Sequence, residues 1–184
     1  MLIPISLAAL LVLCDSVCKN RQTYNRKVFC AIFGIAIFIL VGLRDPNVGG
    51  DADQYQRLYA ASSFESLSHF MHRFALSILP GSGFTEPLFE LVFFKVPQLL
   101  GIGFQGSLLI QGALEGFVIS KAVYRYSDDC LVSALVYIGV FFSSFVIGAM
   151  RQSVALTLLV FIGYFFIERR QPLKFLLLVL VAYL

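Results

Sequence analysis

The chain is short of charge and contains no tryptophan. Only 14% of its 184 residues are charged, against about 25% in a typical soluble domain. Hydrophobic residues make up 59% of the sequence, and its mean hydropathy is +0.85. This composition excludes an ordinary soluble domain and predicts an all-α, polytopic transmembrane helix bundle. Since no low-complexity linker or second polar domain is visible, we read residues 1–184 as a single membrane domain.

Metal and redox motifs are also missing. His69 and His72 are spaced i, i+3 without an HExxH-like context, and they mark an interfacial helix better than a metal site. The cysteines at positions 14, 18, 30 and 130 fall in or beside apolar stretches, as packing thiols do. The sequence therefore predicts no cofactor and no metal. The net charge of +3 gives no reason to expect a nucleic-acid partner.

Apolar runs predict where the chain crosses the membrane. A spanning helix needs about 20 mostly apolar residues. The first run has no basic residues before it and no small-residue cleavage pattern after it, so we expect an uncleaved span with the N-terminus outside. The predicted spans are residues 2–17, 28–43, 106–123, 131–150, 153–167 and 173–184, and residues 44–105 form one long external segment.

Lysine and arginine set the orientation. The connector between the first two spans carries Lys19, Arg21, Arg26 and Lys27 and no acid, so it should be cytoplasmic. If residues 86–103 also crossed, the later basic connectors would be forced outside. We therefore expect that segment to lie on or dip into the outer face, because a charge at mid-bilayer costs about 2.5–3.5 kcal/mol on insertion scales. Its charged or helix-breaking residues are Glu86, Glu90, Lys95 and Pro97.

The external segment itself divides into parts. An alternative topology lets residues 64–79 cross instead, but His69, His72 and Arg73 would then lie in the middle of the span. Residues 44–55 combine three acids with turn-forming Pro46 and a Gly-Gly pair, which indicates an irregular loop that handles something polar. Residues 52–64 and 64–79 repeat apolar positions at helical spacing, as interfacial amphipathic helices do.

Several motifs along the chain resemble one known family. An arginine, Arg44, closes an apolar span and is followed by Val48-Gly49-Gly50-Asp51-Ala52 and Tyr55. Further matches in the same order are Glu86-Pro87-Leu88-Phe89, Lys121 to Tyr126-Ser127, Met150-Arg151-Gln152-Ser153-Val154-Ala155 and Glu168-Arg169-Arg170. From about residue 28 onward the chain resembles the EpsG family of polysaccharide polymerases, which are Wzy-like membrane proteins. The family usually has Thr at the positions of Gly50 and Ala52. It also carries an aromatic-His pair beyond the span that begins at Leu173, so the resemblance implies a chain truncated at its C-terminus.

The resemblance implies a glycosyltransferase reaction on the outer face of the bacterial cytoplasmic (inner) membrane. Oligosaccharide repeat units carried on undecaprenyl pyrophosphate would be joined into O-antigen, capsule or exopolysaccharide, without a metal. The implied partners are that lipid-linked oligosaccharide, membrane lipid and other polysaccharide assembly proteins. Two further classes stay open: a transporter or flippase for a lipid-linked sugar, and a non-catalytic subunit of a polysaccharide assembly complex.

Such a transfer needs a base for the acceptor hydroxyl and cations for the departing pyrophosphate. We expect Asp51 to be the base, because the preceding glycines let the backbone approach a sugar closely, with Asp53 and Asp45 as alternatives. Arg44 and Arg151 would bind the pyrophosphate, since a guanidinium donates two parallel hydrogen bonds to phosphate oxygens. Tyr55, Glu86 and Gln152 complete the predicted substrate-binding set.

Each of these residues has a plainer interpretation as well. Asp51 could serve only as a helix N-cap, and Arg44 could be an interface anchor that reaches the headgroups. Tyr55 could stack on a sugar ring or simply lie at the interface, as many tyrosines do. Glu115 lies inside an apolar span, which favours either a proton-relay or substrate role, or a buried ion pair with Arg151.

Overall fold

The computed structural model describes residues 8–9, 11–13, 15–16, 25–77 and 87–183, and within these ranges the chain is helical without a strand. The predicted first span lies partly outside the described residues. Its described positions are helical, and Leu11 is fully buried against the main core. The prediction of an all-α fold is therefore confirmed for the described part of the chain.

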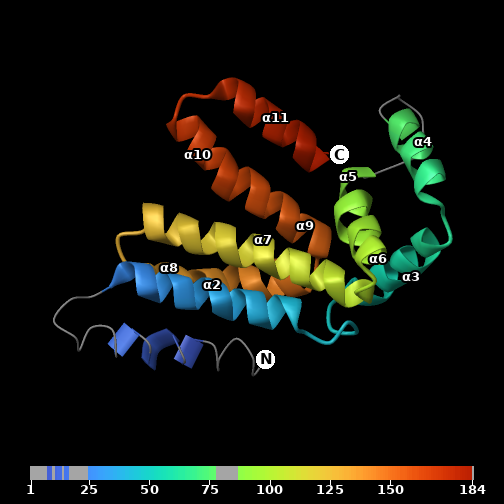
Figure 1. Ribbon diagram of the computed structural model, residues 1–184. Coiled ribbons are helices and arrows are strands. Elements are labelled where there is room, and N and C mark those ends of the chain that lie inside the picture. Colours follow the sequence, from blue (N-terminus) through green and yellow to red (C-terminus); the bar gives the residue numbers. More distant parts are fainter. Residues whose placement is uncertain (1–7, 10, 14, 17–24, 78–86, 184) are drawn as a thin grey trace.

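The body of the molecule is a bundle of antiparallel helices (Figure 1). Each predicted span from residue 28 onward coincides with one helical stretch, and short turns join successive stretches after α7. The stretches are α2 (Arg26–Gly42), α7 (Gly103–Tyr126), α8 (Cys130–Val136) with the π-helical η2 (Tyr137–Ile147), α9 (Met150–Leu156) with η3 (Thr157–Ile162) and α10 (Gly163–Glu168), and α11 (Pro172–Tyr183).

Glycines hold α2 and α7 together along nearly their whole length. A Cβ atom built on Gly34 would lie 2.7 Å from the carbonyl oxygen of Gly116, and one on Gly112 would lie 2.8 Å from the backbone nitrogen of Gly42. Such distances leave no room for any side chain. Small residues four apart are what membrane helices use to bring their backbones into contact, so this pair forms the rigid centre of the bundle.

The main core is formed by α2 and α7 together with α8 and η2. Large apolar side chains recur every four residues along α2, and these are fully buried against α7, α8 and η2. They meet Phe142 of η2, while Tyr137 packs edge-on against Phe33 with ring centroids 6.1 Å apart. The α2 residues of this stripe are Phe29, Phe33, Ile37 and Val41.

The predicted external segment forms a cap of short helices at one end of the bundle (Figure 1). Its helices are α3 (Ala52–Ser63), α4 (Leu67–Ser77), α5 (Pro87–Glu90), the π-helical η1 (Leu91–Lys95) and α6 (Val96–Leu100). The alternative crossing of residues 64–79 lies partly outside the described residues. Its described part contains α4, and the choice between the two topologies stays a prediction.

Two polar side chains fasten η1 and α6 to the end of α3. The ammonium group of buried Lys95 donates to the carbonyl oxygens of Ser62 and Glu65, the latter at 2.9 Å. The amide of Gln98 donates to the carbonyl oxygen of Tyr59 at 2.9 Å and to the hydroxyl of Ser62 at 2.7 Å. These bonds satisfy carbonyl groups that a helix C-terminus leaves open.

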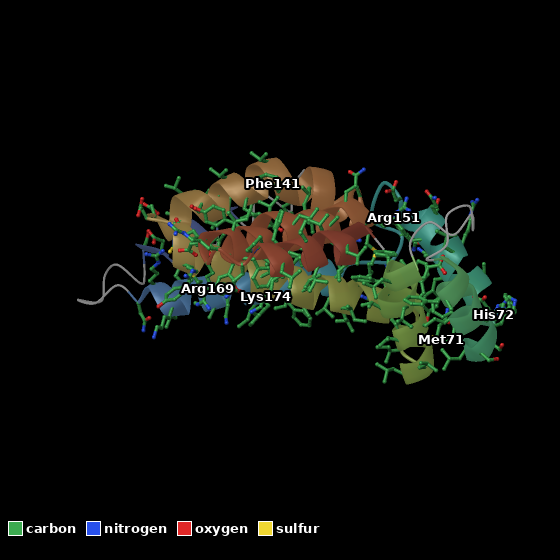
Figure 2. All side chains as sticks on the ribbon, turned by 90° about the horizontal axis from the view of Figure 1, so that it is seen from above. Met71, His72, Phe141, Arg151, Arg169 and Lys174 are labelled. Carbon is green, nitrogen blue, oxygen red and sulfur yellow. The ribbon has the colours of Figure 1, made fainter. Side chains whose placement is uncertain are left out.

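The bundle has two chemically different ends. We call the end that carries the cap and residues 43–51 the loop end, and the opposite one the basic end. Arg169 and Lys174 lie toward the basic end, whereas Arg151 lies toward the loop end (Figure 2). Glu168 pairs with Arg125 at the basic end, at 3.1 Å. Among the described residues one helix, Met150–Glu168, is long and apolar enough to cross a membrane by length and composition.

Candidate functional site

Two loops meet closely at the loop end of the bundle. Gly49 has φ +142°, and a Cβ there would lie 2.6 Å from the carbonyl oxygen of Ile147. A Cβ on Gly50 would lie 3.0 Å from the carbonyl oxygen of Gly148. The sequence predicted that these glycines let the backbone approach a sugar closely, which stays a prediction. What approaches them is the turn between η2 and α9, which places Asp51 beside the first turn of α9.

Arg44 anchors this contact from within. One terminal nitrogen of its guanidinium donates to the carbonyl oxygen of Val146 at 3.0 Å, and the other donates to Oε1 of Gln111 at 3.4 Å. Burial lowers the pKa of Arg44, and the charge of Glu115 opposes that change. Because its guanidinium reaches carbonyl groups at the end of η2, Arg44 fixes the geometry of the two loops.

Behind Arg44 lies a buried polar network. Glu115 and Gln111 are completely buried and Ser153 is nearly so. Oε1 of Glu115 accepts hydrogen bonds from Gln111 at 2.9 Å and from Ser153 at 2.7 Å, and Gln111 also donates to the Ser153 hydroxyl at 2.9 Å. A buried carboxylate needs such donors and a nearby cation. Here the cation that acts on Glu115 is Arg44, not the Arg151 considered from the sequence.

Asp51 and Arg44 line the same small hollow. Arg44, Asp51, Tyr55 and Met150 contribute to its lining, and its free volume of about 10 Å³ has room for about one water molecule. Asp51 occupies the N-cap position of α3, but its carboxylate makes no capping hydrogen bond. Its side chain therefore does not act as the helix N-cap that the sequence left open as an alternative.

Tyr55 joins this hollow to Arg151. The Nε of Arg151 donates to the Tyr55 hydroxyl at 2.9 Å, and its guanidinium lies 5.8 Å from the centroid of the Tyr55 ring. Burial raises the pKa of Tyr55, while the charge of Arg151 opposes the rise. The structure thus brings together four of the predicted residues, Arg44, Asp51, Tyr55 and Arg151, from three separate parts of the chain.

The remaining predicted residues are placed differently. Asp53 is exposed in the first turn of α3 and does not line the hollow. Asp45 accepts bonds at 2.8 and 2.9 Å from the backbone and side chain of Asn47, so it closes a turn. Gln152 is exposed next to Arg151. Glu86 lies outside the described residues.

Sequence reasoning missed the connecting roles of Gln111 and Ser153. Both are polar residues inside apolar spans, and Gln111 precedes Glu115 by one helical turn, which is the available signal. Their contact across α7 and α9 cannot be read from a single sequence. Among the described residues, no group of three or more His, Cys, Asp or Glu side chains is arranged to hold a metal ion.

Comparison with known proteins gives one positive result. The model of the EpsG family matches residues 27–184, which is most of the chain. No curated protein and no solved structure shows significant similarity to it. The matched range begins at the start of α2 and includes the cap, the two loops and the buried network.

Proposed function

Because the chain belongs to the EpsG family, which implies a polymerase-like role in polysaccharide biosynthesis at a membrane, we propose that it joins lipid-linked oligosaccharide repeat units. The donor in this proposal is an oligosaccharide on undecaprenyl pyrophosphate, and the product is O-antigen, capsule or exopolysaccharide. The observation that carries the proposal is the grouping of Asp51, Arg44 and Arg151 around Tyr55.

The proposal places the bundle across the bacterial cytoplasmic membrane, with the loop end outside. The 17 residues of α2 extend about 26 Å, and the 24 residues of α7 about 36 Å, against a hydrocarbon core of about 30 Å. The Lys and Arg residues of the basic end favour the cytoplasm for that end. The N-terminus is then outside if residues 2–17 form a further span.

In the proposed reaction Asp51 takes the proton of an acceptor sugar hydroxyl as its oxygen attacks the anomeric carbon of the donor. The bond from that carbon to the pyrophosphate oxygen breaks, and the lipid pyrophosphate leaves with the electron pair. Arg151 stabilises the departing anion, while Arg44 holds the two loops in place. Since the hollow has room for about one water, sugars enter only when α3 and residues 43–51 move apart from the turn at 147–149.

A polymer ladder on a gel tests this assignment. The chain is expressed in a cell that lacks its own polymerase, beside its Asp51→Asn and Arg151→Ala variants. Matched controls are Asp53→Asn, which changes an exposed acid two residues away, and Arg169→Ala at the basic end. We expect Asp51→Asn and Arg151→Ala to lose the ladder and both controls to keep it, since a general base contributes about 10²–10⁴ in rate. A ladder that persists in Asp51→Asn and Arg151→Ala contradicts the catalytic assignment.

The buried network supports one competing function, transport of a lipid-linked sugar. A flippase would use Glu115 inside the bundle rather than Asp51 at its end. Glu115→Gln and Asp51→Asn separate the two, because a transporter is impaired by the first change and unaffected by the second. If the chain is instead a non-catalytic subunit of an assembly complex, Asp51→Asn should leave unchanged both the partners recovered in a pull-down and the polymer ladder.

A further inference from the structure

A second, larger cavity is lined by Arg151. It is a groove of about 480 Å³ between α5, η1, α7, α9, η3 and the end of α11, and we call it the α9 groove. Figure 1 shows the C-terminal end of α11 near α5 and the start of α9, where these elements converge. Of its 13 described lining residues, 11 are apolar, and the two polar ones are neighbours in sequence, Arg151 and Gln152.

Within the described part of the lining, the polar side chains lie at one end of the groove. Arg151 and Gln152 belong to the first turn of α9, at the loop end of the bundle. Further along, the lining continues with Ala155 of α9 and Leu158 of η3, about 6 and about 10 Å from Arg151 along the axis. Leu114 lines the groove from the neighbouring helix α7. The chemistry therefore changes from cationic to apolar within about two helical turns.

The wall contributed by α5 and η1 is aromatic. Phe89 and Phe93 stack with ring centroids 4.6 Å apart, and both line the groove. Phe93 is almost fully buried, so this wall is supported by the second hydrophobic cluster, to which Leu114 and Leu158 also belong. A flat, supported apolar wall offers contact area to a hydrocarbon chain and no hydrogen bonds to it.

We propose that the α9 groove binds the isoprenoid chain of a polyprenyl phosphate or pyrophosphate, with the phosphate at Arg151 and Gln152. In a polyprenyl phosphate the hydrocarbon follows the phosphate directly. A glycerophospholipid instead places ester oxygens between the phosphate and its chains. The groove offers apolar Ala155 and Leu158 where those esters would lie, so burying them there would leave polar atoms without partners.

This inference rests on the proposed function and gives it a geometry. Arg151 faces two spaces at once, because it lines the groove and also donates to Tyr55 of the hollow. A lipid phosphate held at Arg151 therefore presents its sugar toward Tyr55 and Asp51, while its hydrocarbon lies on the opposite side. The lipid pyrophosphate that leaves after transfer stays in the same groove until it exchanges.

Photo-crosslinking of the purified full chain in nanodiscs tests the assignment without requiring catalysis. The probe is a polyprenyl phosphate with a diazirine near its first isoprene units, and the labelled residues are mapped by mass spectrometry. We expect labels on groove residues of α7 and α9 around Leu114 and Leu158. Unlabelled polyprenyl phosphate should compete, whereas inorganic pyrophosphate and phosphatidylglycerol at the same concentration should not.

Variants make the test specific. Ala155→Trp fills the groove, and we expect it to lower labelling at least tenfold, with Arg151→Ala giving a comparable loss. The matched control is Leu177→Trp, which adds the same side chain at an exposed position of α11 that does not line the groove. Leu114→Ser keeps the space but makes it polar, and it should weaken labelling several-fold even if Ala155→Trp folds poorly.

The outcomes of the two experiments are separable. Groove labelling that Ala155→Trp abolishes, beside a polymer ladder that persists in Asp51→Asn, upholds the groove and overturns the catalytic assignment. A ladder with labels elsewhere, or with labelling unchanged in both Ala155→Trp and Leu114→Ser, overturns the groove and leaves the polymerase intact. Equal labelling by a diazirine phosphatidylglycerol overturns the choice of an isoprenoid lipid.

Discussion

At the scale of single residues, Tyr55 connects the parts of the site. It is buried, it accepts a hydrogen bond from Arg151, and it lines the hollow with Arg44 and Asp51. Its ring also contacts Phe89, with centroids 5.9 Å apart, and Phe89 belongs to the wall of the α9 groove. A substitution that removes the Tyr55 ring should therefore alter the side-chain packing of both the hollow and the α9 groove.

Tyr55→Phe isolates the hydroxyl from the ring. The ring keeps its packing, but the bond from Nε of Arg151 is lost, which costs about 0.5–1.5 kcal/mol in unfolding free energy. We expect shorter polymer as well, because Arg151 loses one of the contacts that orient it. Thermal unfolding in detergent and the polymer ladder measure the two effects, with Tyr59→Phe as the control. An unchanged ladder would show that Arg151 needs no help from Tyr55.

The raised pKa of Tyr55 predicts a pH dependence of stability. The unfolded tyrosine has a pKa of about 10 and the folded one a higher value, so the folded state holds the proton more tightly. This contribution is fully present below pH 10 and is lost as pH rises through the folded pKa. The stability difference between wild type and Tyr55→Phe should be constant from pH 7 to 9 and shrink above 10. A difference that grows above pH 10 contradicts the burial of the hydroxyl.

The residue types of the site could be predicted from the sequence, but their partners could not. Arg44, Asp51 and Arg151 stand out because a charge at the edge of an apolar run must have a reason. The sequence did not predict that Gln111 connects Glu115 to Ser153, because the partner of a side-chain amide in a span is known only once the packing of α7 against α9 is known. Asp45 and Asp51 look alike in sequence, and only the turn with Asn47 separates them.

At the scale of elements, the α2–α7 pair should be the part most sensitive to added volume. Gly116→Ala puts a methyl group against the backbone of Gly34, where there is no space, and overpacking of this kind costs about 1–3 kcal/mol. Gly139→Ala is the matched control, because nothing lies within 4 Å of a Cβ there. Thermal unfolding should show a lower midpoint for the first variant and an equal or higher one for the second.

The cap depends on Lys95 in a similar way. Lys95→Met keeps much of the apolar stem but removes the ammonium group that donates to the carbonyl oxygens of Ser62, in the last turn of α3, and of Glu65, just beyond it. We expect faster proteolysis between α3 and α4, at residues 63–66, while the bundle keeps its unfolding temperature. Lys174→Met at the basic end is the control. Equal cleavage rates in both variants would show that other contacts hold α3.

The bounds of the elements followed from hydropathy better than their packing did. The predicted span at 28–43 became α2, and residues 106–123 became the longer α7, because the polar ends of a helix continue beyond its apolar part. Residues 87–100 are helical and include Lys95 and Pro97, and the placement of this segment outside the membrane stays a prediction. The glycine contacts between α2 and α7 were not predicted, because the spacing of glycines in one helix does not show which other helix packs against them.

At the scale of the whole molecule, the two ends of the bundle make the proposed orientation testable. In a background with all four cysteines replaced by serine, Ser68→Cys marks the cap and Asp128→Cys marks the basic end, and both positions are exposed. A membrane-impermeant maleimide should label Ser68→Cys in intact cells and Asp128→Cys only after permeabilisation. The reverse pattern would place the site in the cytoplasm and contradict a reaction on the outer face.

The small size of the hollow beside Asp51 bears on which acceptor a polymerase of this kind uses. A glycosyl donor with a good leaving group is consumed by hydrolysis whenever a free water reaches both the base and the anomeric carbon. A hollow with room for about one water has none for a sugar ring, so no anomeric carbon reaches Asp51 while the two loops are in contact, and hydrolysis is limited until a sugar acceptor separates them. The same glycines that hold the loops together would thus set the ratio of chain extension to loss of repeat units as free oligosaccharide.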